Sequence, residues 1–305
     1  MTTLRFGRNT VETSNEDKVF FPDKKITKGD LIDYYQRIAD WMLPYLKDRP
    51  LVMKRYPDGI KGESFFQKEM GDYFPDWIDH IKVKKEGGTV THVECNNAAM
   101  LVYLANQACI EPHVWLSKSA KLKYPDQLII DLDPPGNDFG RARFAARVLR
   151  ELLEELDLPA FLKTTGSRGL HVLVPLDQRA DFDTVRKFAQ DAARLLAKRH
   201  SDKLTIEARK AKRRGRLLID TARNAYAQTA IAPYAVRAKP GAPVAVPLDW
   251  DELSDSKLDA QRYNIKNVFQ RLSRKSDPWS GLLRSRHSLN KARQRLDSML
   301  EEESV

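Results

Sequence analysis

Between residues 127 and 220 the chain alternates short apolar runs with amphipathic stretches, and this alternation limits the possible fold more than any other feature of the sequence. The apolar runs predict strands at residues 127–133, 161–164, 170–175, 204–207 and 216–220. The helical spacing of apolar residues predicts helices at residues 139–156 and 183–199. The order strand, helix, two strands, helix, strand is that of a split β-α-β sheet, so we predict an α/β (α+β) fold here.

The rest of the chain also mixes helices and strands. Helices are expected at residues 30–48, where Thr27 and Asp30 form a capping box, and at residues 98–108, 259–272 and 284–295. Strands are expected at residues 51–56, 89–94, 113–117 and 234–237. Because the chain has no internal repeat and no Gly/Ser linker, we expect one two-lobed domain over residues 4–297, with an N-terminal lobe at 4–120 and a catalytic lobe at 121–297.

The net charge indicates a polyanionic partner. The 305 residues include 52 Lys and Arg against 42 Asp and Glu, a formal net charge of +10. Basic side chains gather in the C-terminal tail and in a Gly-containing loop that contains Lys210, Lys212, Arg213, Arg214 and Arg216. Since a membrane partner would call for a basic amphipathic helix instead, nucleic acid is favoured, with a merely solvated basic run as the alternative.

Other classes of protein are excluded by composition. No apolar run approaches the ~18 residues of a membrane span, and the N-terminus lacks the apolar core of a secretory signal. Cys95 and Cys109 are too few for a disulfide framework, so we expect them to be small buried hydrophobes without zinc. A cytoplasmic protein with no membrane partner is expected.

Three aspartates end predicted strands. Asp131 and Asp133 are two residues apart on one strand, so their carboxylates share a face, and Asp220 ends another apolar run. Adjacent carboxylates repel one another, and a hard divalent cation such as Mg²⁺ or Mn²⁺ would neutralise them, as in two-metal phosphoryl transfer. The alternative for Asp131 and Asp133 is a strand that runs into a polar turn, with both side chains capping the bend that follows.

A Gly-containing turn at residues 165–169 joins two predicted strands. It offers backbone amides at Gly166 and Gly169, the hydroxyl of Ser167 and the charge of Arg168, and His171 follows directly. Such a loop can hold a triphosphate through amide donors and a cation. The alternative for His171 is a structural histidine with satisfied hydrogen bonds.

Several motifs stand in a fixed order along the chain. They are residues 14–22, 111–115, 131–135, 164–172, 219–220, 227–229 and 232–237. Together they resemble the polymerase domain of bacterial ligase D, a member of the archaeo-eukaryotic primase superfamily. The resemblance covers nearly the whole chain, to about residue 295.

The resemblance implies a two-lobed primase-polymerase fold, in which helices flank a recognition-motif-like catalytic sheet. It implies a metal-dependent nucleotidyltransferase, a template-directed DNA polymerase or primase that adds nucleotides, preferentially ribonucleotides, to 3′ ends at double-strand breaks in non-homologous end joining. The implied cofactors are Mn²⁺ or Mg²⁺ in a two-metal site, and the substrates are NTP or dNTP. The implied partners are double-stranded DNA ends with a 5′-phosphate, Ku and a DNA ligase, in a bacterial, nucleoid-associated location.

The resemblance also assigns site residues. The catalytic and metal-binding carboxylates are Asp131, Asp133 and Asp220. The nucleotide-binding residues are Lys54, His113, Thr165, Ser167, His171, Gln228 and Arg237. The template-stacking pair is Phe65 and Phe66, and the pocket for the DNA 5′-phosphate is formed by Asn15, Lys18 and Lys28. Thr165 stands where the family usually has Ser, and the hydroxyl is retained.

Other interpretations stay open at this point. Phe65 and Phe66 would ordinarily belong to a core, and Lys18 and Lys28 to a solvated surface. The chain could be a non-catalytic module that bridges 5′-phosphorylated DNA ends, or a nuclease that uses the same aspartates. The sequence leaves open whether it is a free-standing protein or a piece of a multidomain ligase.

Overall fold

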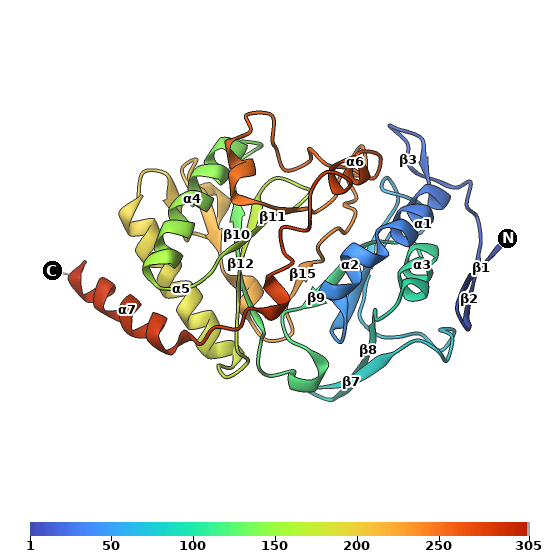
Figure 1. Ribbon diagram of the computed structural model, residues 1–305, viewed down its shortest axis with the longest axis horizontal. Coiled ribbons are helices and arrows are strands. Elements are labelled where there is room, and N and C mark those ends of the chain that lie inside the picture. Colours follow the sequence, from blue (N-terminus) through green and yellow to red (C-terminus); the bar gives the residue numbers. More distant parts are fainter. Residues whose placement is uncertain (304–305) are drawn as a thin grey trace. The chain divides into compact units, whose positions relative to one another are not determined.

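The computed structural model describes residues 1–303, which divide into two compact units (Figure 1). Unit 1 consists of Met1–Ala120, Thr229–Val246 and Tyr263–Asp277, and unit 2 of the remaining segments. The change of unit after Ala120 lies at the expected lobe boundary. However, residues 229–246 and 263–277, which we expected in a catalytic lobe of residues 121–297, belong to unit 1. The first of these segments returns because β15 (Thr229–Ile231) pairs with β9 (Cys109–Trp115).

Unit 2 is built on a sheet with the strand order β13-β14-β10-β12-β11-β16. Its strands are β10 (Gln127–Asp133), β11 (Phe161–Thr164), β12 (Leu170–Pro175), β13 (Leu204–Thr205), β14 (Leu217–Asp220) and β16 (Pro247–Leu248). Neighbouring strands are antiparallel except β13 and β14, which are parallel. Because β10 lies between β14 and β12, with β11 beyond β12, the central strands have the split β-α-β order, and the predicted fold class is confirmed.

Two capped helices connect these strands. The side chain of Asp138 accepts the N–H of Arg141 at the start of α4 (Phe139–Glu155), and Asp181 accepts that of Thr184 at the start of α5 (Phe182–Arg199). Both helices agree with the prediction within one residue, and Figure 1 shows them beside the sheet. The last helix, α7 (Leu289–Glu302), is tied to α5 by buried Asp191, which accepts hydrogen bonds from Lys187, Arg194 and Arg293.

Unit 1 contains a second sheet, with the order β15-β9-β5-β8-β7 and with β6 paired to β5. Its further strands are β5 (Pro50–Arg55), β6 (Phe65–Gln67), β7 (His80–Lys85) and β8 (Gly88–Glu94). Two separate ladders precede it, formed by β1 (Thr2–Phe6) with β2 (Asn9–Thr13) and by β3 (Val19–Phe21) with β4 (Ile26–Thr27). The sequence patterns missed β1–β4, β6, β7, β15 and β16, which are too short or too exposed to give a clear apolar alternation.

The helices of unit 1 are α1 (Lys28–Arg37), α2 (Ala39–Leu46) and α3 (Ala98–Asn106). The predicted capping box is confirmed, since Thr27 accepts the N–H of Asp30 and Asp30 accepts that of Thr27. The prediction of one helix over residues 30–48 is wrong, because the chain leaves the helix at Ile38 and resumes it as α2. Pro44 lies inside α2 and has no N–H to donate, which weakens this part of the hydrogen-bond ladder.

Two further predictions are wrong. Residues 234–237 do not form a strand, because Tyr234 has a φ of 62° and the segment makes only an isolated bridge from Val236 to Val244. Of residues 259–272 only α6 (Val268–Leu272) is helical. The side chains of Asp259 and Asn264 each accept a backbone N–H two residues ahead, and these turns compete with a helix.

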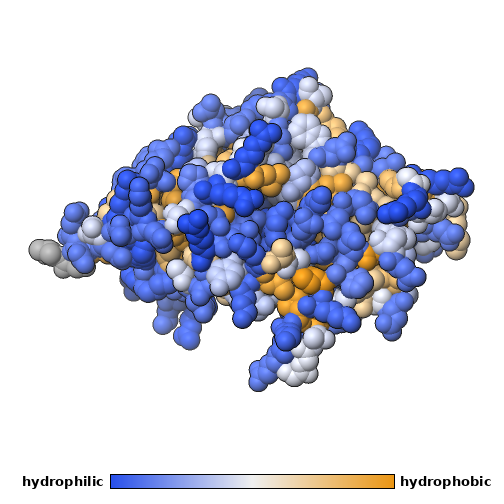
Figure 2. All heavy atoms as spheres, turned by 60° about the horizontal axis from the view of Figure 1, so that its bottom comes forward, coloured by the Kyte–Doolittle hydropathy of each residue, from blue (hydrophilic) through white to orange (hydrophobic). Residues whose placement is uncertain are grey.

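Hydrophilic residues cover most of the face seen in Figure 2. Cys95 and Cys109 are buried, as predicted. Within residues 1–303, none of the helices combines the length and the apolar character needed to cross a bilayer.

Candidate active site

The residues expected to carry chemistry lie in a row across the sheet of unit 2. The register pairs Asp131 of β10 with Asp220 of β14 on one side and with His171 of β12 on the other. His171 is paired in turn with Lys163 of β11. Directly paired residues of antiparallel strands project from the same face, so these side chains form one continuous row, which we call the β10 row. Asp133, two residues beyond Asp131, projects from that face as well.

Guanidinium groups surround the carboxylates of this row. Asp133 Oδ1 lies 2.9 Å from Arg168 Nη2, and its Oδ2 lies 3.2 Å from Arg213 Nη1. Arg223 Nε lies 4.0 Å from Asp131 Oδ2. These cations offset the repulsion between neighbouring carboxylates. They also balance the negative charge of the aspartates, so that a polyanionic ligand would not be repelled from the site.

His171 is buried next to Asp131, with its Nε2 3.4 Å from Asp131 Oδ2. Burial, together with the charge of Lys163, lowers the pKa of His171 to about 4, so the imidazole is neutral at pH 7. Burial by itself would raise the pKa of Asp131, but His171 and Arg223 lower it below its ordinary value, so this group is a carboxylate. Among the described residues, Nδ1 of His171 has no hydrogen-bond partner.

The turn at residues 165–169 is held mainly by its own first residue. Thr165 Oγ1 donates to the carbonyl of Gly169 and accepts the N–H groups of Ser167 and Gly169. The Gly169 amide is therefore already paired inside the turn. Glycine is required at this position, because a Cβ there would lie 1.9 Å from the carbonyl oxygen of Leu132. The turn thus packs closely on β10 and presents Arg168 to Asp133.

As oxygen donors, the aspartates fit a hard divalent cation. Asp131 and Asp220 are direct neighbours in the strand register. Within residues 1–303, however, no group of three or more Asp, Glu, His and Cys side chains is arranged to hold a metal ion. Asp133, the third expected ligand, has both oxygens engaged by Arg168 and Arg213. A cation would therefore meet Asp131 and Asp220 first, and Asp133 only after its arginines change partner.

A second cluster of expected site residues surrounds buried Glu111 in unit 1. Its Oε1 accepts Arg237 Nε and the N–H of Ala238, each at 2.9 Å. Its Oε2 lies 3.5 Å from Lys54 Nζ and 3.7 Å from His113 Nε2. Burial alone would raise the pKa of Glu111, but these neighbours hold it well below its usual range. The structure therefore brings together three of the predicted nucleotide-binding residues through one carboxylate.

Phe65 and Phe66 do not belong to the core. They lie on β6, an edge strand, with exposed fractions of 46% and 57%. Phe66 is paired with Lys54, its ring is 5.3 Å from Lys54 Nζ, and it meets His113 edge-on at 5.7 Å between ring centroids. Both rings thus stand free to contact a flat ligand, Phe66 beside the Glu111 cluster.

Asn15, Lys18 and Lys28 are brought together at the β3-β4 ladder. The N–H of Lys28 donates to the carbonyl of Lys18, and that of Lys18 to the carbonyl of Asn15. Lys18 Nζ pairs with Asp58 Oδ1 at 2.6 Å. Lys28 is buried rather than solvated, and its Nζ donates to the carbonyl of Ser14 at 2.6 Å. Burial lowers the pKa of Lys28 to about 8.

The basic loop at residues 210–216 has a defined conformation. Its Arg213 is half-buried and binds the carbonyls of Glu207 and Ala208 as well as Asp133. Gly215 has a φ of 75°, and its carbonyl accepts Arg141 Nη1. By contrast Lys210, Lys212 and Arg214 are exposed. Arg216 is half-buried and donates to the carbonyls of Arg213 and Ser201. The loop therefore holds Arg213 in the site and presents only its three exposed cations to solvent.

Sequence reasoning missed several residues that position the site. Lys163 has no motif signal of its own, and only the strand pairing places it in the β10 row. Glu111 belongs to the motif at residues 111–115, in which His113 was assigned a role and Glu111 was not. Buried Asn224 accepts the N–H of Ile129 and donates to its carbonyl, so it tethers β10 where that strand has no neighbour from β14. By contrast Gln228, which was predicted to bind the nucleotide, is exposed and is the last residue of a unit 2 segment.

Comparison with known proteins gives consistent matches. The family model of the LigD primase-polymerase domain matches residues 27–279. The "Multifunctional non-homologous end joining protein LigD" of Pseudomonas aeruginosa is 34% identical over 288 residues, which cover 93% of this chain and 34% of that protein. The "Bifunctional non-homologous end joining protein LigD" of Bacillus subtilis is 33% identical over 271 residues, which cover 88% of this chain and 43% of that protein. The chain therefore spans less than half the length of these relatives.

A solved structure is also similar. The polymerase domain of Mycobacterium tuberculosis ligase D in complex with DNA matches with a TM-score of 0.84 and 30% sequence identity. The match covers 91% of this chain and 99% of that one.

Proposed function

Because the chain belongs to the LigD primase-polymerase domain family, we propose that it is a metal-dependent nucleotidyltransferase that extends a DNA 3′ end along a template. The β10 row is the observation that carries this proposal. It brings Asp131 and Asp220 together in the register and places Asp133 and Arg168 beside them. A nuclease could use the same carboxylates, but it would have no use for a cation and an imidazole placed to receive a triphosphate, the role proposed for Arg168 and His171.

The aspartates and His171 of the β10 row, and Arg168 beside it, have distinct tasks in this proposal. Asp131 and Asp220 would hold the divalent cations, with Asp133 joining them. Cations held there would supply activation of the attacking 3′-hydroxyl and neutralisation of the leaving pyrophosphate. Arg168 provides a charge for phosphate oxygens, and the free Nδ1 of His171 is available to a polar group of the nucleotide.

The Glu111 cluster of unit 1 is proposed to contact the incoming nucleotide as well. Lys54 and Arg237 carry two positive charges against the single charge of Glu111, which leaves a surplus for phosphate. Glu111 fixes the directions of these side chains in advance, so less side-chain entropy is lost on binding. Phe66, exposed beside Lys54, fits a stacking contact with a base.

The cluster of Asn15, Lys18 and Lys28 is proposed to bind the 5′-phosphate of a DNA end. Lys28 is buried, and its ammonium group gives one of its donors to the carbonyl of Ser14 and has others to offer a ligand. A dianionic phosphate would accept charge-assisted hydrogen bonds from these remaining donors. Since the relatives are named as end-joining proteins, we place the activity at double-strand breaks, with Mn²⁺ or Mg²⁺, a preference for ribonucleotides, and Ku and a DNA ligase as partners.

The proposal is tested by nucleotide incorporation on a gapped duplex with a 5′-phosphate. The full chain is incubated with each labelled NTP or dNTP and Mn²⁺, and the templating base is varied. We expect addition of the complementary nucleotide, faster with ribonucleotides and with the phosphorylated gap. Tight binding to phosphorylated ends without any incorporation would refute the polymerase and favour a non-catalytic end-bridging module. Shortening of the primer in place of its extension would favour a nuclease.

A further inference from the structure

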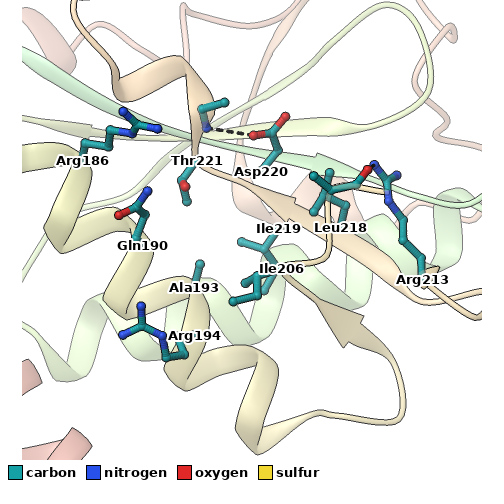
Figure 3. A pocket seen from close by; sticks show the side chains of 12 residues that line it. Arg186, Gln190, Ala193, Arg194, Ile206, Arg213, Leu218, Ile219, Asp220 and Thr221 are labelled. Carbon is teal, nitrogen blue, oxygen red and sulfur yellow. Dashed lines mark hydrogen bonds between the residues drawn. The ribbon is translucent and has the colours of Figure 1, made fainter. Parts of the chain in front are cut away.

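A pocket of about 470 Å³ opens beside Asp220 in unit 2 (Figure 3). Figure 3 shows Arg186, Gln190 and Arg194 of α5 along one side and Ile206 on the other, with Asp220 at one end. Apart from Asp220 and Arg213, which also line it, none of the residues that line the pocket belongs to the site described above. We call it the α5 pocket.

The pocket exists because the edge of the sheet is incomplete. The edge strand β13 is only two residues long and pairs with Leu217 and Leu218 of β14. The chain then leaves the sheet, so within residues 1–303 no strand lies alongside the outer edge of Ile219 and Asp220. Ile206, the first residue after β13, is 48% exposed although it is a large apolar residue. The space that a longer strand would fill is therefore open, and Asp220 is one of the residues that line it.

The lining of the α5 pocket is positively charged. Arg186, Gln190 and Arg194 are four residues apart on α5, so they lie on one face of the helix. The side chains of Arg186 and Gln190 make no hydrogen bond or ion pair within residues 1–303. Arg194 shares buried Asp191 with two other cations, Lys187 and Arg293, so this group has a surplus of positive charge. Among the lining residues Asp220 is the acidic one, and we have assigned it to the metal.

A single strand of nucleic acid fits this combination. Eight residues of α-helix separate Arg186 from Arg194, a rise of about 12 Å, and a duplex strand rises about 3.4 Å per nucleotide, so the two arginines span roughly three to four nucleotides. The exposed side chain of Ile206 offers apolar contact to a sugar or a base edge. A compact metabolite would use only part of so extended a row.

On the basis of the proposed function, we infer that the α5 pocket binds the backbone of the primer strand, with Arg186 and Arg194 on phosphates near its 3′ end. The pocket would then deliver the 3′-hydroxyl to Asp220 from the open edge of β14. This inference gives the primer its own binding residues, distinct from the Glu111 cluster and from the lysines proposed for the 5′-phosphate.

The test measures DNA binding without chemistry. The full chain and its R186A variant are titrated by fluorescence anisotropy against a 3′-recessed duplex at several salt concentrations, with no nucleotide present. R179A is the matched control, because the side chain of Arg179 is 83% exposed and lies outside the pocket. We expect R186A to bind about fivefold to tenfold more weakly and to lower the slope of log K against log salt by about 0.9, with R179A unchanged.

Neutral methylphosphonate linkages identify the strand. When these linkages replace the three primer phosphates nearest the 3′ end, the parent chain should lose as much DNA affinity as the R186A substitution removes. The R186A variant should lose no further affinity. The same linkages in the template strand should weaken both proteins equally. We call the effects coupled when the linkages cost the parent chain affinity but cost R186A none. Coupling to the template strand, coupling to neither strand, or an equal loss of affinity in R179A would overturn the inference.

The outcome is independent of the incorporation assay. Coupling to primer phosphates in a chain that adds no nucleotide would support the pocket and refute the polymerase. Incorporation in a chain without such coupling would refute the pocket alone. Because R194A also disturbs Asp191, R186A carries the test, and its far-UV circular dichroism verifies that it folds.

Discussion

Replacing Glu111 should destabilise unit 1 far more than an ordinary surface substitution. Glu111 is only 3% exposed, and its carboxylate accepts two hydrogen bonds of 2.9 Å, from Arg237 and from the backbone of Ala238. Lys54 and His113 stand on its other oxygen. Removal of the carboxylate in E111A leaves the partly buried cations of Arg237 and Lys54 without their shared counter-charge.

The magnitude follows from these contacts. Each hydrogen bond to a charged group contributes about 1.5–3 kcal/mol, and breaking a buried ion pair costs about 3–5 kcal/mol once the desolvation of the remaining charge is included. We therefore expect E111A to lower the free energy of unfolding by about 3–5 kcal/mol. The control D33A removes an exposed pair with Arg37 on α1 and should cost no more than about 0.5 kcal/mol.

Urea denaturation followed by circular dichroism measures the free energy of unfolding of both variants. A second readout is the pH dependence of the free energy of unfolding of E111Q relative to the parent chain. Burial alone would raise the pKa of Glu111, but His113 and Arg237 lower it well below its usual 4.5. A carboxyl group whose pKa is depressed by folding stabilises the folded state fully when the pH is above its pKa in the unfolded state. That stabilisation is lost as the pH falls toward and through its pKa in the folded state. The stability gap between the parent chain and E111Q should be full at pH 7 and shrink below about pH 4.5. Equal losses in E111A and D33A would refute the reasoning.

Three further predictions concern other parts of the site. The preference for phosphorylated over unphosphorylated DNA ends should fall as the pH rises from 7 to 9, because the Lys28 ammonium, with a pKa of about 8, loses its charge; an unchanged binding ratio would contradict this. G169A should lose at least about 2 kcal/mol of stability in urea, because its Cβ would collide with a β10 carbonyl, whereas G281A, whose Cβ would make only an ordinary van der Waals contact with Phe161 at 3.9 Å, should unfold as the parent does. K212A/R214A should flatten the slope of log K against log salt by about 0.9 for each DNA phosphate that these side chains neutralise in the parent chain, and an unchanged slope would make them a solvated surface.

The sequence predicted the sheet of unit 2 well because its strands are buried and its helices are amphipathic and capped. Every central strand is an apolar run, and Asp138 and Asp181 mark the helix starts. The failures have local causes. Turns capped by Asp259 and Asn264 replaced a helix whose apolar spacing was weak, and Tyr234 adopted a left-handed φ that no pattern indicates.

The site residues, too, include some that the sequence predicted and some that it did not. The spacing of Asp131 and Asp133 indicated a shared face, and the register confirmed it. The pairing of Asp133 with Arg213 could not be predicted, because it depends on how an 11-residue connection from β13 to β14 folds back on β10. Lys163 and Glu111 were missed for a related reason, since their roles come from partners on other strands. Tertiary pairing, and not local pattern, decides which charged groups meet.

If the β10 row carries out nucleotide addition, the loss of one of its carboxylates should remove incorporation without removing DNA binding. Single-turnover incorporation on a 5′-phosphorylated gapped duplex is compared for the parent chain, D220N and the control D202N, whose side chain is 73% exposed. DNA binding is measured on the same samples. The account predicts that D220N loses incorporation on the order of a thousandfold while it still binds the duplex, and that D202N matches the parent. Incorporation by D220N at the parent rate, with saturating Mn²⁺, would contradict it.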